Sequence, residues 1–192
     1  MTRTTPLQIL AILLAALLPA TSQADDASNH LQMSFGGRVS VPTCRVVIPE
    51  KNVVMPSVLI TDFDSLNQGD LFAQKEFSVS VAGCNGGEAL FSQVVLYFEQ
   101  KNNLYDEHFP AFKNEVVDIV TPHALGLGAI ITDVRDDQNV IGSDFKPLPI
   151  IYDTATYPLG SEYHFIAHYM KTSATVTSGY FASSVIISAT YQ

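Results

Sequence analysis

Basic residues are scarce in this chain. The 192-residue sequence holds 10 Lys and Arg against 19 Asp and Glu, which gives a formal net charge of −9 at pH 7. Proteins that bind nucleic acid neutralise phosphates with clustered Lys and Arg, and the sequence has no such cluster. The same scarcity argues against attachment to an anionic membrane by charge alone. We therefore expect no nucleic-acid partner.

The sequence also lacks an apolar stretch long enough to cross a membrane, for which about 20 residues are needed. An apolar run, Ile9–Leu18, follows the lone charge of Arg3 and precedes Ser22-Gln23-Ala24, which has small residues three positions and one position before a cut. This order is typical of a secretory signal peptide. We expect cleavage after Ala24, which removes residues 1–24 and exports the rest.

There are only two cysteines, Cys44 and Cys84, and no CxxC spacing that would indicate a metal or redox site. An exported chain meets an oxidising compartment, where two cysteines form a disulfide by default. The bridge would close a loop of 40 positions and contribute about 4 kcal/mol by chain entropy.

Motifs for catalysis are missing as well. Nothing resembles the Gly-x-Ser-x-Gly turn of a serine hydrolase. His164 and His168 are four positions apart, but their surroundings alternate as in a strand, which would separate them by about 13 Å and prevent them from sharing a metal. We expect no catalytic residue, no cofactor and no metal.

Four aspartates, Asp133, Asp136, Asp137 and Asp144, lie close together in the sequence. Their spacing differs from that of an EF-hand loop, and no glycine stands at its sixth position. We interpret them as part of a solvated hairpin turn.

Short runs of alternating apolar and polar residues, separated by turn residues, predict an all-β domain. The predicted strands are Leu31–Phe35, Phe77–Val81, Val94–Phe98, Leu127–Thr132, Phe145–Tyr152, Tyr163–Tyr169 and Tyr180–Tyr191. The run Val94–Phe98 is apolar throughout and suits a strand buried on both faces. Any helix is short, with 61–71 as the candidate. The polar stretch 100–116 is interpreted as a long surface loop.

The last predicted strand carries apolar side chains on both faces. One face consists of Phe181, Ser183, Val185, Ile187, Ala189 and Tyr191, and the strand lies between Gly179 and Gln192. Such a strand should lie inside a sandwich. Because the chain ends there, no later strand can cover its outer edge, and an exposed apolar edge invites pairing with another chain.

A second short strand is left without a local partner at the other end of the sequence. Leu31, Met33, Phe35 and Gly37 alternate with polar residues ahead of Cys44, after the polar tail 25–30. The chain therefore combines an unpaired acceptor edge with a spare strand.

These features together resemble the type 1 pilin-like subunits of chaperone–usher fimbriae. Phe35-Gly36-Gly37 matches a Phe-x-Gly motif seven residues before the first cysteine, and the cysteines are 40 apart. Phe77 to Cys84 reads Phe-x-Val-x-Val-x-x-Cys. Gly179 is fourteenth from the end, and Tyr191 is a penultimate aromatic residue. The resemblance extends over 25–192 and is weakest over 100–126.

The resemblance implies an incomplete immunoglobulin-like β-sandwich, the pilin fold without its last strand, over residues 39–192. Residues 25–38 would form an N-terminal extension whose Leu31, Met33, Phe35 and Gly37 complete a neighbouring subunit. The edge Gly179–Gln192 would bind a periplasmic chaperone first and, at an outer-membrane usher, the next subunit's extension by β-strand addition. The subunit would pass through the periplasm to a cell-surface fimbria.

Several alternatives remain open from the sequence. The chain could be a major subunit, a minor or adapter subunit, or a terminator, because Leu31 stands where many major pilins have glycine. A host receptor is an open question. In a different class, the chain could be a monomeric secreted carbohydrate-binding module with a closed sandwich.

Overall fold

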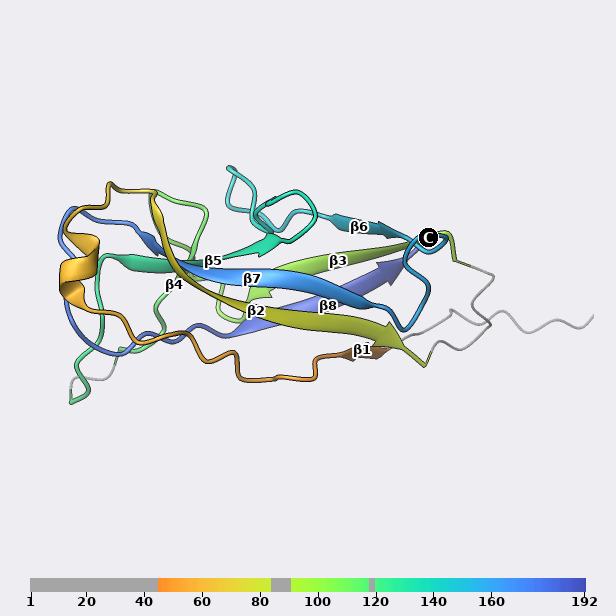
Figure 1. The fold of residues 1–192 in the computed structure, drawn as a ribbon, viewed down its shortest axis with the longest axis horizontal. Helices are drawn as coiled ribbons and strands as arrows, with labels where there is room; N and C mark the ends of the chain where they lie inside the picture. The colour runs from red at the N-terminus through yellow and green to blue at the C-terminus, as the bar shows by residue number, and fades with distance from the viewer. Residues whose placement is uncertain (1–44, 84–90, 118–119) are drawn as a thin grey trace, which may run out of the picture. The chain divides into compact units, whose positions relative to one another are not determined.

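The computed structural model describes residues 45–83, 91–117 and 120–192. Over these residues the chain forms eight strands and one short 3-10 helix (Figure 1). The strands are β1 (Arg45–Val47), β2 (Leu71–Ala82), β3 (Gln93–Gln100), β4 (Phe112–Lys113), β5 (Leu127–Asp133), β6 (Ile150–Asp153), β7 (Glu162–Lys171) and β8 (Val185–Tyr191), and the helix is η1 (Ile60–Phe63). None of the described residues belongs to a helix that is long and apolar enough to span a membrane.

The strands form two antiparallel sheets. One has the order β1-β2-β7-β5-β4 and the other the order β6-β3-β8. Both contribute to one buried cluster, with Val79 and Phe165 from the larger sheet and Leu96, Phe98 and Ile150 from the smaller one. The predicted all-β sandwich is therefore confirmed.

Alternation of side chains explains the central strands. In β7, Tyr163, Phe165, Ala167 and Tyr169 are buried, and His164 between them is exposed. Side chains two positions apart share a face of a strand, so one face supplies the core. The strands predicted over Phe77–Val81, Leu127–Thr132 and Tyr163–Tyr169 are present within longer or equal elements.

Three predicted elements are shorter than expected. The last strand, predicted over Tyr180–Tyr191, begins only at Val185 in β8. The strand predicted over Phe145–Tyr152 begins only at Ile150 in β6. Pro147 and Pro149 precede it, and proline cannot donate a ladder hydrogen bond. The short helix expected within 61–71 is the 3-10 helix η1, which ends at Phe63.

The interpretation of 100–116 as a surface loop was wrong in part. β4 lies within this stretch and pairs with β5, and Ala111 and Phe112 are fully buried. Phe112 enters the main core, whereas Ala111 packs with Ile130 and Met170 in a separate small cluster. Polar residues surround these two buried residues. Two residues are too few to show the alternation of apolar and polar side chains that predicts a strand.

The interpretation of the aspartate stretch as wholly solvated was also wrong at Asp133. Its side chain is 1% exposed and accepts hydrogen bonds from Arg135 and from the Tyr152 hydroxyl, at 2.6 and 3.0 Å. The Arg135 guanidinium also lies 3.7 Å from the centre of the Tyr152 ring. Burial would raise the pKa of Asp133, but the hydrogen bonds and the charge of Arg135 outweigh burial and lower this pKa.

Candidate functional site

β8 is an edge strand. It pairs with β3 on one side, from Val94 opposite Tyr191 to Gln100 opposite Val185, and among the described residues no strand pairs with its other side. The expectation that both faces of this strand are buried was wrong. Ile186 on the outer face is 51% exposed and Tyr180 before the strand is 67% exposed. Over the described part of the chain, one other sheet packs against the sheet of β8, and it covers one face of this strand.

The register identifies the backbone groups that β8 leaves free. Gln192 and Gln93 exchange both hydrogen bonds, at 3.1 and 2.9 Å. Hydrogen-bonded pairs alternate along an antiparallel ladder, so Ile186, Ser188 and Thr190 also bond to β3. The N–H and C=O groups of the residues between them point to the free edge; these residues are Val185, Ile187, Ala189 and Tyr191.

Those same four residues turn their side chains toward the core, where they are only half-buried. The inward residues of β3 beside them, Val94, Leu96 and Phe98, are completely buried. Because the two strands lie in one sheet and face one core, the difference means that the core is uncovered along β8.

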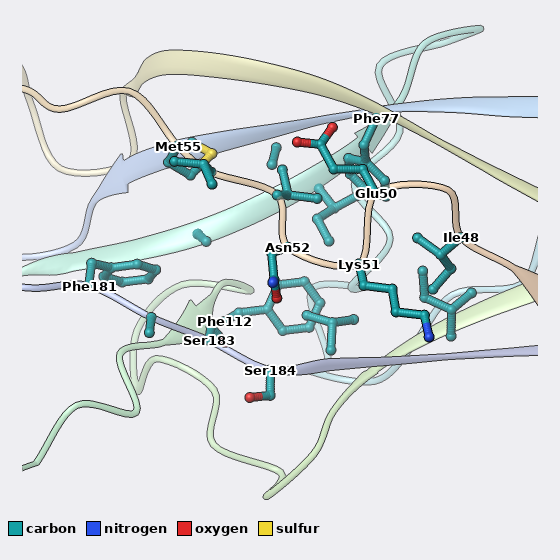
Figure 2. A pocket seen from close by; sticks show the side chains of 18 of the residues that line it. Ile48, Glu50, Lys51, Asn52, Met55, Phe77, Phe112, Phe181, Ser183 and Ser184 are labelled. Atoms are coloured by element: carbon teal, nitrogen blue, oxygen red, sulfur yellow. The ribbon is translucent and has the colours of Figure 1, made fainter.

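A groove of about 610 Å³ opens there (Figure 2). One wall is the segment 48–55, with Ile48 and Met55 among its side chains, and the other wall runs from Phe181 to Ile187. Core residues form the floor, namely Phe77, Phe112, Ala129, Ile131, Ala167 and Tyr169. The groove thus exposes apolar core side chains next to unpaired backbone groups.

Gly179 shapes the entry to this strand. A Cβ atom there would lie 2.4 to 2.7 Å from backbone atoms of His123 and Ala124, and its φ is +150°. The close approach lets Tyr180 bond to Pro122 and Ala124 at 2.8 and 3.0 Å. The glycine that the sequence singled out therefore allows the final segment to pack directly on another stretch of backbone.

Hydrogen bonds from Ser92, the residue before β3, and from Gln93 in β3 hold the end of the chain after β8. The Gln192 carbonyl accepts bonds from the Ser92 and Gln93 amides at 2.7 and 2.9 Å and from the Ser92 hydroxyl at 3.0 Å. The Tyr191 ring packs on Phe91, with centres 5.5 Å apart, and burial raises the pKa of Tyr191. The penultimate aromatic residue thus covers one end of the core.

The sequence analysis did not predict a polar contact between Gln100 and Ser183 at the start of the groove. Gln100 is 1% exposed and donates to the Ser183 hydroxyl at 3.0 Å and to the Lys113 carbonyl at 2.9 Å. Its Oε1 atom has no hydrogen-bond partner among the described residues. Gln100 ends an apolar strand, and no local pattern indicates that its side chain turns inward.

Other predicted residues are not brought together. His164 bonds to Glu76 at 3.0 Å on the outer face of the larger sheet. Within the described ranges, no group of three or more His, Cys, Asp or Glu could hold a metal. The predicted strand residues Leu31, Met33, Phe35 and Gly37 lie outside the described residues. Cys44 and Cys84 do too.

Comparison with known proteins fits this geometry. The family model described as "Fimbrial protein" matches residues 33–192. The chain belongs to the fimbrial protein family. A comparison with curated protein sequences finds no match.

Two solved structures resemble the fold. The P pilus rod subunit PapA has a TM-score of 0.51 and 18% identity, over 78% of this chain and 99% of that one. The CupB6 tip adhesin from Pseudomonas aeruginosa has a TM-score of 0.50 and 16% identity, over 68% of this chain and 33% of that one. This chain therefore matches about a third of the adhesin.

The resemblance to pilin-like fimbrial subunits that the sequence predicted is confirmed. The chain is a fimbrial subunit that associates with other fimbrial subunits in a fibre on the cell surface. The family consists of structural proteins, and the chain is not an enzyme.

Proposed function

We propose that this subunit polymerises by donor-strand exchange and that the fibre it builds supports adhesion. The groove beside β8 accepts an extended segment of a neighbouring subunit, and residues 31–37 of this chain enter the groove of the next. The observation that carries the proposal is the free edge of β8, where unpaired backbone groups adjoin an open apolar groove. An added strand satisfies the backbone, and its side chains fill the groove.

The energetics are adequate for a long-lived fibre. Leu31, Met33 and Phe35 would each contribute roughly 1.5–3 kcal/mol on burial, before the cost of ordering the segment. Ladder hydrogen bonds add to this along Val185, Ile187, Ala189 and Tyr191.

A periplasmic chaperone would occupy the groove first, because an uncovered apolar edge is prone to aggregate. The outer-membrane usher is then the place of exchange. This route requires a signal peptide over residues 1–24 and an oxidising compartment, where Cys44 and Cys84 would pair. In support of the disulfide, Arg45, the residue after Cys44, lies opposite Ala82, two residues before Cys84, in the β1–β2 ladder.

The open groove favours a subunit that accepts a further donor over a terminator. The groove is open along the wall from Phe181 to Ile187. The small floor residues Ala129 and Ala167 leave room for large donor side chains. Family membership likewise favours a fimbrial subunit over the carbohydrate-binding module.

The test is to place an acid inside the groove. In cells that assemble the fimbria, Ile187→Asp puts a carboxylate where the donor's apolar side chains are buried. We expect about tenfold less of this subunit in sheared fimbriae, because a buried unpaired charge is costly.

Ile186→Asp is the matched control, since it adds the same charge one residue away on the exposed face of β8. We expect normal incorporation of this variant. Equal amounts of the two variants in the fibre would overturn the proposal.

A further inference from the structure

A second pocket, which we call the outer pocket, lies at one end of the larger sheet. The register places Leu71, at the start of β2, beside Met170, and Leu127, at the start of β5, beside Lys171 (Figure 1). The turn before β2, the turn after β7 and the loop that leads into β4 meet there. They surround a space of about 520 Å³, which is within the range of small-molecule sites, about 300–1,000 Å³.

Polar side chains line the outer pocket at several depths. Four exposed ones form its rim, namely Gln68, Glu107, His108 and Lys113. Further in are three others, the half-buried Asp106 and Ser173 and the buried Thr172. A molecule in the outer pocket would therefore meet amide, carboxylate and hydroxyl groups both at the rim and inside.

Thr172 is the most buried of these polar residues, with 8% of its surface exposed. Its methyl group lies on the Gly128 side, 3.2 Å from where a Cβ of Gly128 would be. Its amide donates to the Gly126 carbonyl at 2.9 Å. Its hydroxyl, in contrast, has no hydrogen-bond partner among the described residues. Because Thr172 lines the outer pocket, a ligand there can satisfy this hydroxyl.

Backbone hydrogen bonds hold Asp106 in place and leave one of its oxygens free. Its Oδ1 atom accepts bonds from the amides of His108 and Phe109, at 2.9 and 3.2 Å. Its own amide donates to the Ala111 carbonyl at 2.8 Å. No group of the described residues bonds to Oδ2. The carboxylate therefore offers an acceptor whose position is set before a ligand arrives.

Phe109 adds an apolar surface with a fixed position. It packs on the small buried cluster of Ala111, Ile130 and Met170. Its ring also lies against Gly69, 3.2 Å from where a Cβ would be. Phe109 is only half-buried and lines the outer pocket. An aromatic ring among hydroxyl and carboxylate groups suits a ligand with both C–H and O–H surfaces.

The charges in the lining disfavour ionic ligands. Lys113 pairs with Glu107 at 3.4 Å, so its charge is already engaged. Asp106 and Glu107 would repel a phosphate, sulfate or carboxylate group. In the part of the chain that the structure describes, no group of three or more His, Cys, Asp or Glu could hold a metal ion. These charges leave an uncharged ligand with several hydroxyl groups.

We propose that the outer pocket binds the ring of a neutral sugar. A sugar hydroxyl donates to Asp106, and another exchanges a hydrogen bond with Thr172, because hydroxyls both donate and accept. The C–H face of the ring packs on Phe109. This inference rests on the adhesive role proposed above and names the partner's class, a cell-surface glycan with a neutral sugar.

The outer pocket and the groove lie on opposite faces of the larger sheet. Phe112 lines the groove, and Lys113, the next residue of β4, lines the outer pocket. In β5, Ala129 and Ile131 line the groove, and Ile130 between them packs with Phe109. Neighbouring side chains of a strand point to opposite faces. A strand added in the groove therefore does not cover the outer pocket.

Photoreactive sugars test the proposal in sheared wild-type fimbriae. The neutral probes are galactose, mannose and N-acetylglucosamine, each carrying a diazirine, and N-acetylneuraminic acid with the same group is the charged probe. We expect at least one neutral probe to label residues 105–113 or 172–173 of this subunit, as mapped by mass spectrometry. An excess of the same free sugar should abolish this labelling. The charged probe should label these residues at least about fivefold less.

Thr172→Val and Thr175→Val form a matched pair of variants. Valine resembles threonine in shape and lacks the hydroxyl. Thr172 lines the outer pocket, whereas Thr175 is exposed and does not. We expect labelling to fall about tenfold with Thr172→Val, because a hydrogen bond in the pocket is lost, and to be unchanged with Thr175→Val. Both variants should enter fimbriae in normal amounts, which shows that they fold.

Gln68→Ala provides a second variant, at the exposed rim, where the change does not disturb the core. We expect labelling to fall about threefold, and this variant decides the outcome if Thr172→Val fails to enter the fibre.

Three results would overturn the sugar pocket. They are no competed labelling by any neutral probe, undiminished labelling of the Thr172→Val or Gln68→Ala variant, and stronger labelling by the charged probe. Each leaves donor-strand exchange in place, since the fibres have assembled. Normal incorporation of Ile187→Asp, in turn, contradicts donor-strand exchange and leaves the labelling of the outer pocket as evidence for the sugar.

Discussion

β3 and β8 lie side by side in one sheet and turn alternate side chains to one core, but they are covered differently. The inward residues of β3 are completely buried, and those of β8 are half-buried. Both strands are rich in β-branched and aromatic residues, so composition does not account for the contrast. Among the strands that the structure describes, β3 has a partner on each side, whereas β8 has one. The core is therefore incompletely covered along the edge strand β8, and this edge is where we place the function.

The largest expected effect comes from truncating facing residues of the two strands. Phe98 lies opposite Ile187, is fully buried, and has its ring 4.7 Å from that of Phe165. In a chain without residues 25–37, we expect Phe98→Ala to lower the free energy of unfolding by about 3–5 kcal/mol and Ile187→Ala by about 1 kcal/mol. Urea unfolding measures both.

Adding a synthetic peptide of residues 25–37 to the shortened chain as a donor strand sharpens this comparison. If the peptide covers the groove, the cost of Ile187→Ala should rise and that of Phe98→Ala should stay the same. Similar costs for the two truncations in the shortened chain would contradict the contrast between a covered and an uncovered strand.

The next largest effect on stability concerns the buried Asp133, which bonds to Arg135 and Tyr152. The pKa of Asp133 is lowered in the folded state, so its stabilisation is present above the unfolded value of about 3.9 and is lost as pH falls through the folded value. Asp133→Asn should cost about 2 kcal/mol at pH 7 and less at pH 2–3. Unfolding curves at several pH values test this, and a cost independent of pH would refute it.

The smallest effect separates two glycines with positive φ. Gly179 has backbone atoms 2.4 to 2.7 Å from the position of a Cβ, whereas Gly160, with φ +92°, has none within 4 Å. Alanine is strained at both positions, but only at residue 179 does it also collide. We expect Gly179→Ala to cost about 1–3 kcal/mol more than Gly160→Ala. Thermal unfolding of both variants provides the measurement, and equal midpoints would count against the packing of Gly179 on His123.

The sequence predicted the strands whose side chains alternate clearly, such as 163–169, because burial on one face produces that period. It did not predict the inward turn of Gln100, the burial of Ala111 and Phe112, or the pairing of Asp133 with Arg135. Each of these depends on a contact across the fold and leaves no local period. Of the site, the row from Gly179 to Gln192 could be identified, but the wall 48–55 could not, because it is irregular and contains Pro49.

The order of residues alone determined the all-β class, the final alternating row and the resemblance to fimbrial subunits, because these depend on side-chain periodicity and short spacings. Only the tertiary structure decided that β8 stands at an edge, that its free backbone groups belong to the residues that also face the core, and that a groove lies beside them. Which strands become neighbours depends on packing between distant segments, and a linear pattern holds no information on the space left between two sheets.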